Sequence, residues 1–337
     1  MPLSTTECLL QCMQVVETAW ALFELNGSLQ GDLTERLLSE IDRRSRSEPT
    51  ESLCDALRLL GSLPMRRPWP LLAPLGEQLC HVSTSGGVLV PQMLTEVIDG
   101  LARLRYDEPK LLDALESQLV RTLEQPEVLH EAQACTIIEA LGALHYHGRS
   151  STILTLLIER LHSVQQLLPH SAVALVHGLA LLHVEPPAPL GIADIMRLMS
   201  ASGLAIDPAE AGTLLWSLVQ LGCAELAREA IRTLPVDIAE TAQHADLHSL
   251  TLCLWSLLTL RCYEHRLTIA VLQAISQAAS GVALPAQLCR IAECMLMLQL
   301  EAPPELGLVL PPLLCQKAQL AWQQVQLQVS TRPAAAP

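Results

Sequence analysis

The sequence predicts an all-α protein, built as an α-solenoid of about eight αα-hairpin repeats of 38–40 residues. Half of the 337 residues are apolar but only 3% are aromatic, and Leu and Ala supply most of the apolar content. Both residues favour helices, and no segment alternates apolar and polar residues as a strand does. One phrase also recurs along the chain, as TAWALFELNG at 18–27, LLWSLVQLGC at 214–223 and CLWSLLTLRC at 253–262.

The repeat is defined by a leucine that directly precedes a turn, which we call the anchor. The anchors are Leu25, Leu60, Leu104, Leu144, Leu182, Leu221, Leu260 and Leu298. Successive anchors are 35, 44, 40, 38, 39, 39 and 38 residues apart. So steady a period indicates stacked repeats rather than independent elements.

Two columns before the anchor place it on a helix, which we call helix A of each repeat. Three residues earlier the chain has a long apolar side chain: Leu22, Leu57, Leu101, Leu141, Leu179, Leu218, Leu257 and Met295. Four residues earlier it has a small residue: Ala21, Ala56, Gly100, Ala140, Gly178, Ser217, Ser256 and Cys294. Residues three and four apart share a helix face. We therefore expect the anchors and both columns to be buried, with neighbouring helices A side by side.

A short polar turn follows the anchor, and a second amphipathic segment, helix B, follows the turn. Segments 109–123 and 151–168 show apolar residues at helical spacing. Pro109 and Pro189 suit the first turn of such a helix. Each repeat is thus an αα-hairpin whose apolar face is covered only when hairpins stack.

We expect a single repeat domain over residues 1–330, with different ends. Residues 1–14 are amphipathic and predict an N-terminal cap, and the Gln-rich segment 311–330 predicts a C-terminal capping helix. The stretch 41–52 is expected to be a loop between the first two repeats, and residues 331–337 a tail.

The charge argues against a general polyanion binder. The net charge is −14, and only two of the 21 basic residues are lysines, Lys110 and Lys317, whereas such binders are usually basic and Lys-rich. A local basic strip remains compatible with this total.

The eleven cysteines include no C-x-x-C pair, and we interpret them as reduced core thiols of a reducing compartment, with a metal or redox site as the alternative.

The wording of the repeat resembles the octotricopeptide repeat and the helical repeats of FAST-kinase-like and RAP-type proteins of organelles. Two segments carry this resemblance: LLWSLVQLG at 214–222, and VIDGLARLRYDEPKLLDALESQL at 97–119, which has a similar pattern of small residues, leucines and a short turn. The resemblance extends over roughly residues 15–310. The resemblance implies a noncatalytic protein of organellar RNA metabolism. It would bind single-stranded or ribosomal RNA, or serve as a subunit among the proteins of an RNA-handling assembly such as a mitoribosome. The implied location is the mitochondrion, or alternatively the plastid.

Two departures, the missing RAP-like module and the acidic repeats, weaken the RNA interpretation. No RAP-like α/β module is seen in the sequence, and residues 1–17 lack the basic residues of a signal or transit peptide. The column five residues before the anchor holds carboxylates in four of eight repeats, at Asp55, Asp99, Glu139 and Glu293. Facing RNA, these would repel phosphates. A HEAT-like protein–protein scaffold without RNA contact is therefore the alternative function.

The candidate RNA contacts follow the anchor, where the chain turns outward. The position directly after it holds Asn26, Gly61, Arg105, His145, His183, Gly222, Arg261 and Gln299, which we call the rim column. Arginine can contact phosphate, and histidine can donate a hydrogen bond or stack. With neighbours in sequence, the candidates are Arg103, Arg105, His145, Arg149, His183 and Arg261. The alternative is that these residues are polar only because they lie in turns.

No pattern indicates catalysis or a cofactor. Phosphate-binding, dinucleotide-binding, nucleophile-elbow and zinc-protease motifs are missing from the sequence. His145 and His147 form an H-x-H pair that we interpret as turn residues. We expect neither enzyme activity, a small-molecule substrate nor a bound metal, and the longest apolar runs, such as 250–260, are too short for a membrane span.

Overall fold

The structure is a computed structural model that describes residues 76–331 with gaps. Within that range the residues not described are 78, 82–88, 124–128, 147–149, 187–189, 205, 234–246, 264–265, 279–284, 303–305 and 307–308. The expected N-terminal cap, the first two repeats with anchors Leu25 and Leu60, and the tail from residue 332 onward lie outside the described residues.

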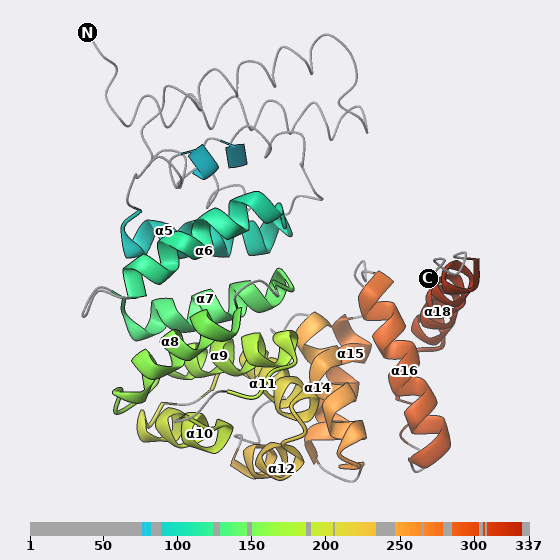
Figure 1. The fold of residues 1–337 in the computed structure, drawn as a ribbon. Coiled ribbons are helices and arrows are strands. Elements are labelled where there is room, and N and C mark those ends of the chain that lie inside the picture. Colours follow the sequence, from blue (N-terminus) through green and yellow to red (C-terminus); the bar gives the residue numbers. More distant parts are fainter. Residues whose placement is uncertain are drawn as a thin grey trace, which may run out of the picture. The chain divides into compact units, whose positions relative to one another are not determined.

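Every regular element among the described residues is an α-helix, which confirms the all-α prediction (Figure 1). The helices A are α5 (Pro91–Leu104), α7 (Glu131–Ala143), α9 (Pro169–Leu182), α11 (Pro208–Gln220), α14 (Leu247–Thr259) and α16 (Pro285–Glu301). The helices B are α6 (Pro109–Leu123), α8 (Ser150–His162), α10 (Ile192–Ala201), α12 (Ala224–Thr233) and α15 (Arg266–Ala278), and α18 (Pro312–Thr331) follows α16. The predicted C-terminal capping segment 311–330 is therefore helical.

Prolines begin many of these helices. Pro91, Pro169, Pro208 and Pro312 are the first residues of α5, α9, α11 and α18, where the missing N–H has no intrahelical partner to lose. Pro109 begins α6 as predicted, and Pro189 lies outside the described residues.

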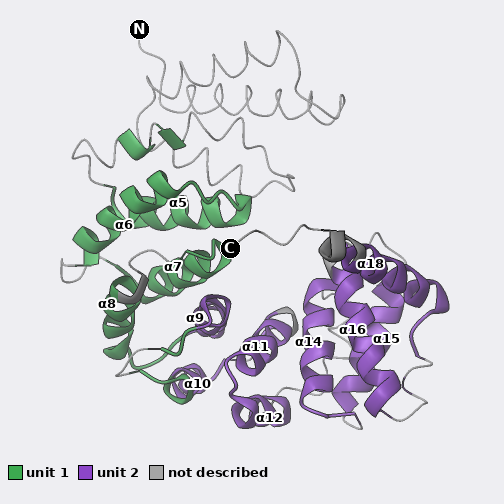
Figure 2. Ribbon diagram, turned by 45° about the vertical axis from the view of Figure 1, so that its right-hand side comes forward, with its two compact units in different colours: residues 1–167, 184–194 green, residues 168–183, 195–337 purple. Residues whose placement is uncertain are grey.

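The chain forms two compact units (Figure 2). Unit 1 comprises residues 1–167 and 184–194, and unit 2 comprises residues 168–183 and 195–337. In unit 1, α5 packs against α7; in unit 2, α9 packs against α11, α11 against α14, and α14 against α16. The hairpin partners α5 and α6, α7 and α8, α11 and α12, and α14 and α15 also pack together. Neighbouring helices A therefore lie side by side within each unit, an arrangement consistent with an α-solenoid.

The predicted columns are buried where the structure describes them. Three residues before the anchor, the side chains from Leu101 to Met295 are at most 8% exposed, and the small column from Gly100 to Cys294 is buried throughout. Five of the six described anchors are buried, and the sixth, Leu221, is half-buried. Burial of these columns confirms the predicted register of helix A.

Two helices A approach closely at Gly212 of α11. A Cβ built there would lie 2.3 Å from the carbonyl oxygen of Ser249 and 3.3 Å from Cβ of Cys253, both on α14. Only glycine lets the two backbones meet at this distance without movement. Gly212 thus sets the separation of α11 and α14 at one end of their contact.

Two predicted helix ends differ from the structure. Segment 151–168 was expected to be helical throughout, but α8 ends at His162, and the Ser163 hydroxyl donates to the carbonyl oxygen of Arg160 (3.1 Å) as the chain leaves the helix. A turn was also expected directly after every anchor, but α16 continues past Leu298 to Glu301. Gln299 is therefore a helical residue rather than a turn residue.

Candidate functional site

The rim column corresponds to one backbone conformation. Arg105, His145, His183 and Arg261 have φ of 51°, 50°, 55° and 59°, and Gly222 has φ of 73°. These are left-handed values, which most residues with a Cβ avoid. Together with Gly203 (φ 66°), they are the residues with positive φ in the described part of the chain. The sequence column thus marks a repeated left-handed turn at the end of helix A.

Two backbone hydrogen bonds close each of four of these turns. The N–H of Arg105 donates to the carbonyl oxygen of Ala102, and the N–H of Tyr106 donates to that of Leu101, both at 3.0 Å. The same pair of bonds ends helix A at His145, Gly222 and Arg261. This is the Schellman motif, which satisfies carbonyl groups that a helix end leaves unpaired. It accounts for Gly222 and His145 of the rim column without any ligand.

The candidate arginines differ in their ion pairs. Arg103 Nε lies 3.0 Å from Oδ2 of Asp99, one helical turn earlier, and Arg261 Nε lies 3.4 Å from Oε2 of Glu301. The Tyr263 hydroxyl donates to the same Glu301 oxygen at 2.8 Å. Two of the cations expected to meet phosphate therefore already face carboxylates.

The remaining rim candidates are exposed. Arg105 and His145 in unit 1 and His183 in unit 2 are all exposed, and for none of them does the structure give an ion pair with a described residue. Arg149 and His147 lie outside the described residues. The structure thus places four of the six candidates at equivalent turns and the fifth, Arg103, on the last turn of α5.

The column five residues before the anchor is half-buried and differs between the units. In unit 1 it holds Asp99 and Glu139, and in unit 2 it holds His177, Trp216 and Trp255 and then Glu293. Because successive helices A pack together, this column follows the row of helices across each unit. Unit 1 therefore presents carboxylates at positions where unit 2 presents three rings.

His177 and Trp216 form the core of the ring-bearing column. Their ring centroids are 5.5 Å apart at an interplanar angle of 49°, and His177 Nδ1 lies 3.5 Å from the Ser217 hydroxyl. That hydroxyl donates to the carbonyl oxygen of Thr213 (2.7 Å), so Nδ1–H is suited to be the donor to Ser217. Burial, with a smaller contribution from the charge of His248, lowers the pKa of His177 to about 4. The imidazole is thus neutral at physiological pH.

Arg290 joins this column from α16, and sequence reasoning missed it. Its Cζ lies 5.9 Å from the Trp216 ring centroid, within the range of a cation–π interaction. Arg290 is eight residues before its anchor, a position where the other repeats show no common residue type. No sequence signal could therefore have paired it with Trp216, which lies two repeats earlier.

A buried polar group links α6 to the turn after α7. The Tyr146 hydroxyl is shared between Oδ1 of Asp113 (3.0 Å) and Oε2 of Glu116. Burial and these two carboxylates raise the pKa of Tyr146 above its ordinary value. Glu116 is 7% exposed, and its Oε1 has no hydrogen-bond partner among the residues that the structure describes. These hydrogen bonds hold Tyr146, the second residue after the anchor Leu144, against α6.

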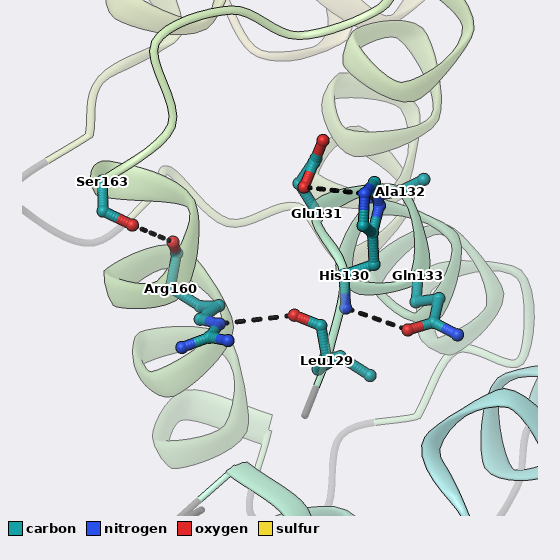
Figure 3. A network of polar contacts seen from close by, with 7 residues as sticks. All are labelled: Leu129, His130, Glu131, Ala132, Gln133, Arg160 and Ser163. Carbon is teal, nitrogen blue, oxygen red and sulfur yellow. Dashed lines mark hydrogen bonds and ion pairs between the residues drawn. The ribbon is translucent and has the colours of Figure 1, made fainter. Parts of the chain in front are cut away.

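A second polar network lies at the start of α7 (Figure 3). His130 caps the helix: its Nδ1 accepts from the N–H of Ala132 (3.4 Å), and its own N–H donates to Oε1 of Gln133 (2.9 Å). Arg160 Nε donates to the carbonyl oxygen of Leu129 (3.3 Å) and so ties α8 to the residue before the cap. Figure 3 shows that these side chains satisfy backbone groups and one another, which is the role of a structural cap.

The described cysteines show no arrangement for a metal. Among the described residues, no group of three or more His, Cys, Asp or Glu side chains could hold a metal ion. Burial raises the pKa of Cys135 and Cys253 to about 12. These two thiols are therefore protonated and unreactive at neutral pH.

Comparison with models of known protein families and with curated protein sequences finds no match. The resemblance to organellar helical repeats accordingly stays a prediction. None of the described helices combines the length and apolar character needed to cross a bilayer.

Proposed function

We propose that the chain is a noncatalytic α-solenoid of about eight αα-hairpins that acts as a protein-binding subunit of a larger assembly. Side-by-side helices A and the repeated left-handed turn support the solenoid. Stacked repeats place one helix A beside the next, and such a row of helices provides an extended binding surface in repeat proteins.

One observation favours protein over RNA as the partner: two of the three candidate arginines that the structure describes already pair with carboxylates. Asp99 faces Arg103, and Glu301 faces Arg261. RNA would have to compete with these carboxylates while approaching a chain of net charge −14. Affinity for a nucleic acid depends chiefly on cations that neutralise phosphates, so compensated arginines support the scaffold.

Direct contact with single-stranded or ribosomal RNA is the second candidate function. It is favoured by the recurrence of Arg105, His145 and His183, each exposed at an equivalent turn. The likeness of the repeat to organellar families supports an RNA-handling assembly, such as a mitoribosome, in the mitochondrion or alternatively the plastid. Either location is part of the proposal.

The test is binding of fluorescein-labelled single-stranded RNA followed by anisotropy at about 50 mM salt, where phosphate contacts are strong. We expect no saturable binding by the full chain. Saturable binding that weakens with salt and is lost in Arg105→Glu/Arg261→Glu would overturn the preference for protein partners. Arg232→Glu is the matched control, because Arg232 is an exposed arginine on helix α12 rather than at a rim turn.

A further inference from the structure

We propose that the ring-bearing face of unit 2 binds a proline-rich protein segment in the polyproline II conformation, with one turn of the ligand on each helix A. This inference rests on the proposed protein-binding function and names the class of partner. The face is formed by His177 on α9, Trp216 on α11, Trp255 on α14 and Arg290 on α16, which we call the ring face.

The first argument is the unpaired hydrogen-bond donors of the ring face. Trp216 and Trp255 are both half-buried, and an indole Nε1–H that becomes buried usually has a hydrogen-bond partner. The structure gives neither indole N–H an acceptor among the described residues. Arg290, also half-buried, has its guanidinium over Trp216 (5.9 Å) and no ion pair with a described carboxylate. Three strong donors on one face are thus left to solvent or to a ligand.

The second argument is charge. At the positions five and eight residues before the anchors of unit 2, the charged groups among the described residues are Arg290 and Glu293, both on α16. His177 is neutral because its pKa is lowered to about 4. A face with one cation and one anion offers little to a polyanion such as RNA. The acceptors it suits are therefore uncharged, such as backbone carbonyl oxygens.

The third argument is spacing. Packed helices lie roughly 8–10 Å apart, and α11 packs against both α9 and α14. Polyproline II has three residues per turn and rises roughly 9 Å per turn, so successive turns match successive helices A. Its backbone makes no internal hydrogen bonds, which leaves carbonyl oxygens for the donors of the ring face. Aromatic-lined grooves bind proline-rich segments by the same combination of ring contact and donated hydrogen bonds.

The experiment measures binding of fluorescein-labelled decaproline to the full chain by anisotropy. A Gly-Ser decapeptide, a deca-glutamate peptide and single-stranded RNA of ten uridines serve as competing ligand classes. We expect saturable binding of decaproline alone. Trp216→Phe keeps the ring but removes the N–H donor, so it should weaken binding about fivefold, the equivalent of one net hydrogen bond. Trp255→Phe should do the same.

The matched control is Trp322→Phe on α18, a half-buried tryptophan outside the ring face, which should bind decaproline as the wild type does. Absence of decaproline binding at about 1 mM ligand, or an equal loss in the control, would overturn the inference. Preference for deca-glutamate would also overturn it but leave the scaffold function standing. Preference for RNA, with loss in Trp216→Phe, would overturn both.

Discussion

Replacing Gly212 by alanine should reverse the usual effect of this substitution in a helix. In a helix interior, alanine is more stable than glycine by about 1 kcal/mol. At Gly212, however, the added Cβ would lie 2.3 Å from the carbonyl oxygen of Ser249 and 3.1 Å from its carbonyl carbon. Both atoms belong to the backbone of α14, so no side-chain rotation relieves the clash. The two helices have to separate.

The magnitude follows from the two opposing effects. Overpacking a well-packed contact costs about 1–3 kcal/mol, and here the clash involves rigid backbone, so we expect the upper part of that range before the propensity gain is subtracted. The net loss in free energy of unfolding should then be about 1–2 kcal/mol. Urea unfolding followed by circular dichroism measures it as a lower midpoint with an unchanged slope.

Gly222→Ala provides the comparison. Nothing lies within 4 Å of a Cβ built at Gly222, whose φ is 73°, so its cost is conformational only, about 1 kcal/mol. A Gly212→Ala protein that is as stable as the wild type, or more stable, would refute the close approach of α11 and α14. In that case the substitution would show only the higher helix propensity of alanine, with no clash against α14.

Four further outcomes are expected. Gly178→Leu, at a buried position of α9, should lower the free energy of unfolding by about 1–3 kcal/mol in chemical denaturation, and unchanged stability would show that the small column faces water. Tyr146→Phe removes the donor shared by two carboxylates of α6 and should cost about 1.5–3 kcal/mol; a loss below a few tenths would mean that these bonds add nothing. Since the folded-state pKa of His177 is lowered to about 4 from 6.5, the unfolded chain binds the proton first, and stability should fall by at most about 3 kcal/mol as the pH drops from about 6.5 to about 4. In His177→Phe this part of the pH dependence should vanish, and an identical curve for both proteins would contradict the assignment. Finally, Cys135 and Cys253 should react with a thiol reagent at pH 8 only after unfolding, as mass spectrometry of labelled peptides would show; labelling of either in the folded protein would disprove their burial.

The helical class and the register of helix A could be predicted because both depend on local periodicity. Leu179 and Gly178, for instance, recur at fixed distances from an anchor, and residues three and four apart on a helix must share a face. The turn after α16 was mispredicted at Gln299 because the anchor pattern is the same whether the helix stops there or continues. A helix end depends on the residues beyond it, where propensity alone is a weak guide.

The candidate site was less accessible to sequence reasoning. The ion pair of Asp99 with Arg103 is a local i, i+4 contact and could have been expected. The pair of Arg261 with Glu301 joins residues 40 apart, about one repeat, and requires knowledge of which helices are neighbours. The left-handed turn could have been predicted from residue type, because three positions of the rim column hold Asn or Gly, the residues that favour this conformation.

The left-handed turns also offer a way to separate folding from function. Arg105, His145, His183 and Arg261 each hold a conformation that costs a residue with a Cβ about 1 kcal/mol relative to glycine, yet their side chains are exposed. Glycine at these positions should relieve the strain while deleting the side chain. Because the four sites are distant from one another in the sequence, their effects on the free energy of unfolding should add. A quadruple glycine variant should be a more stable form of the protein with a bare rim. Any activity that such a variant loses would have to come from the deleted side chains, since the fold would be reinforced rather than weakened.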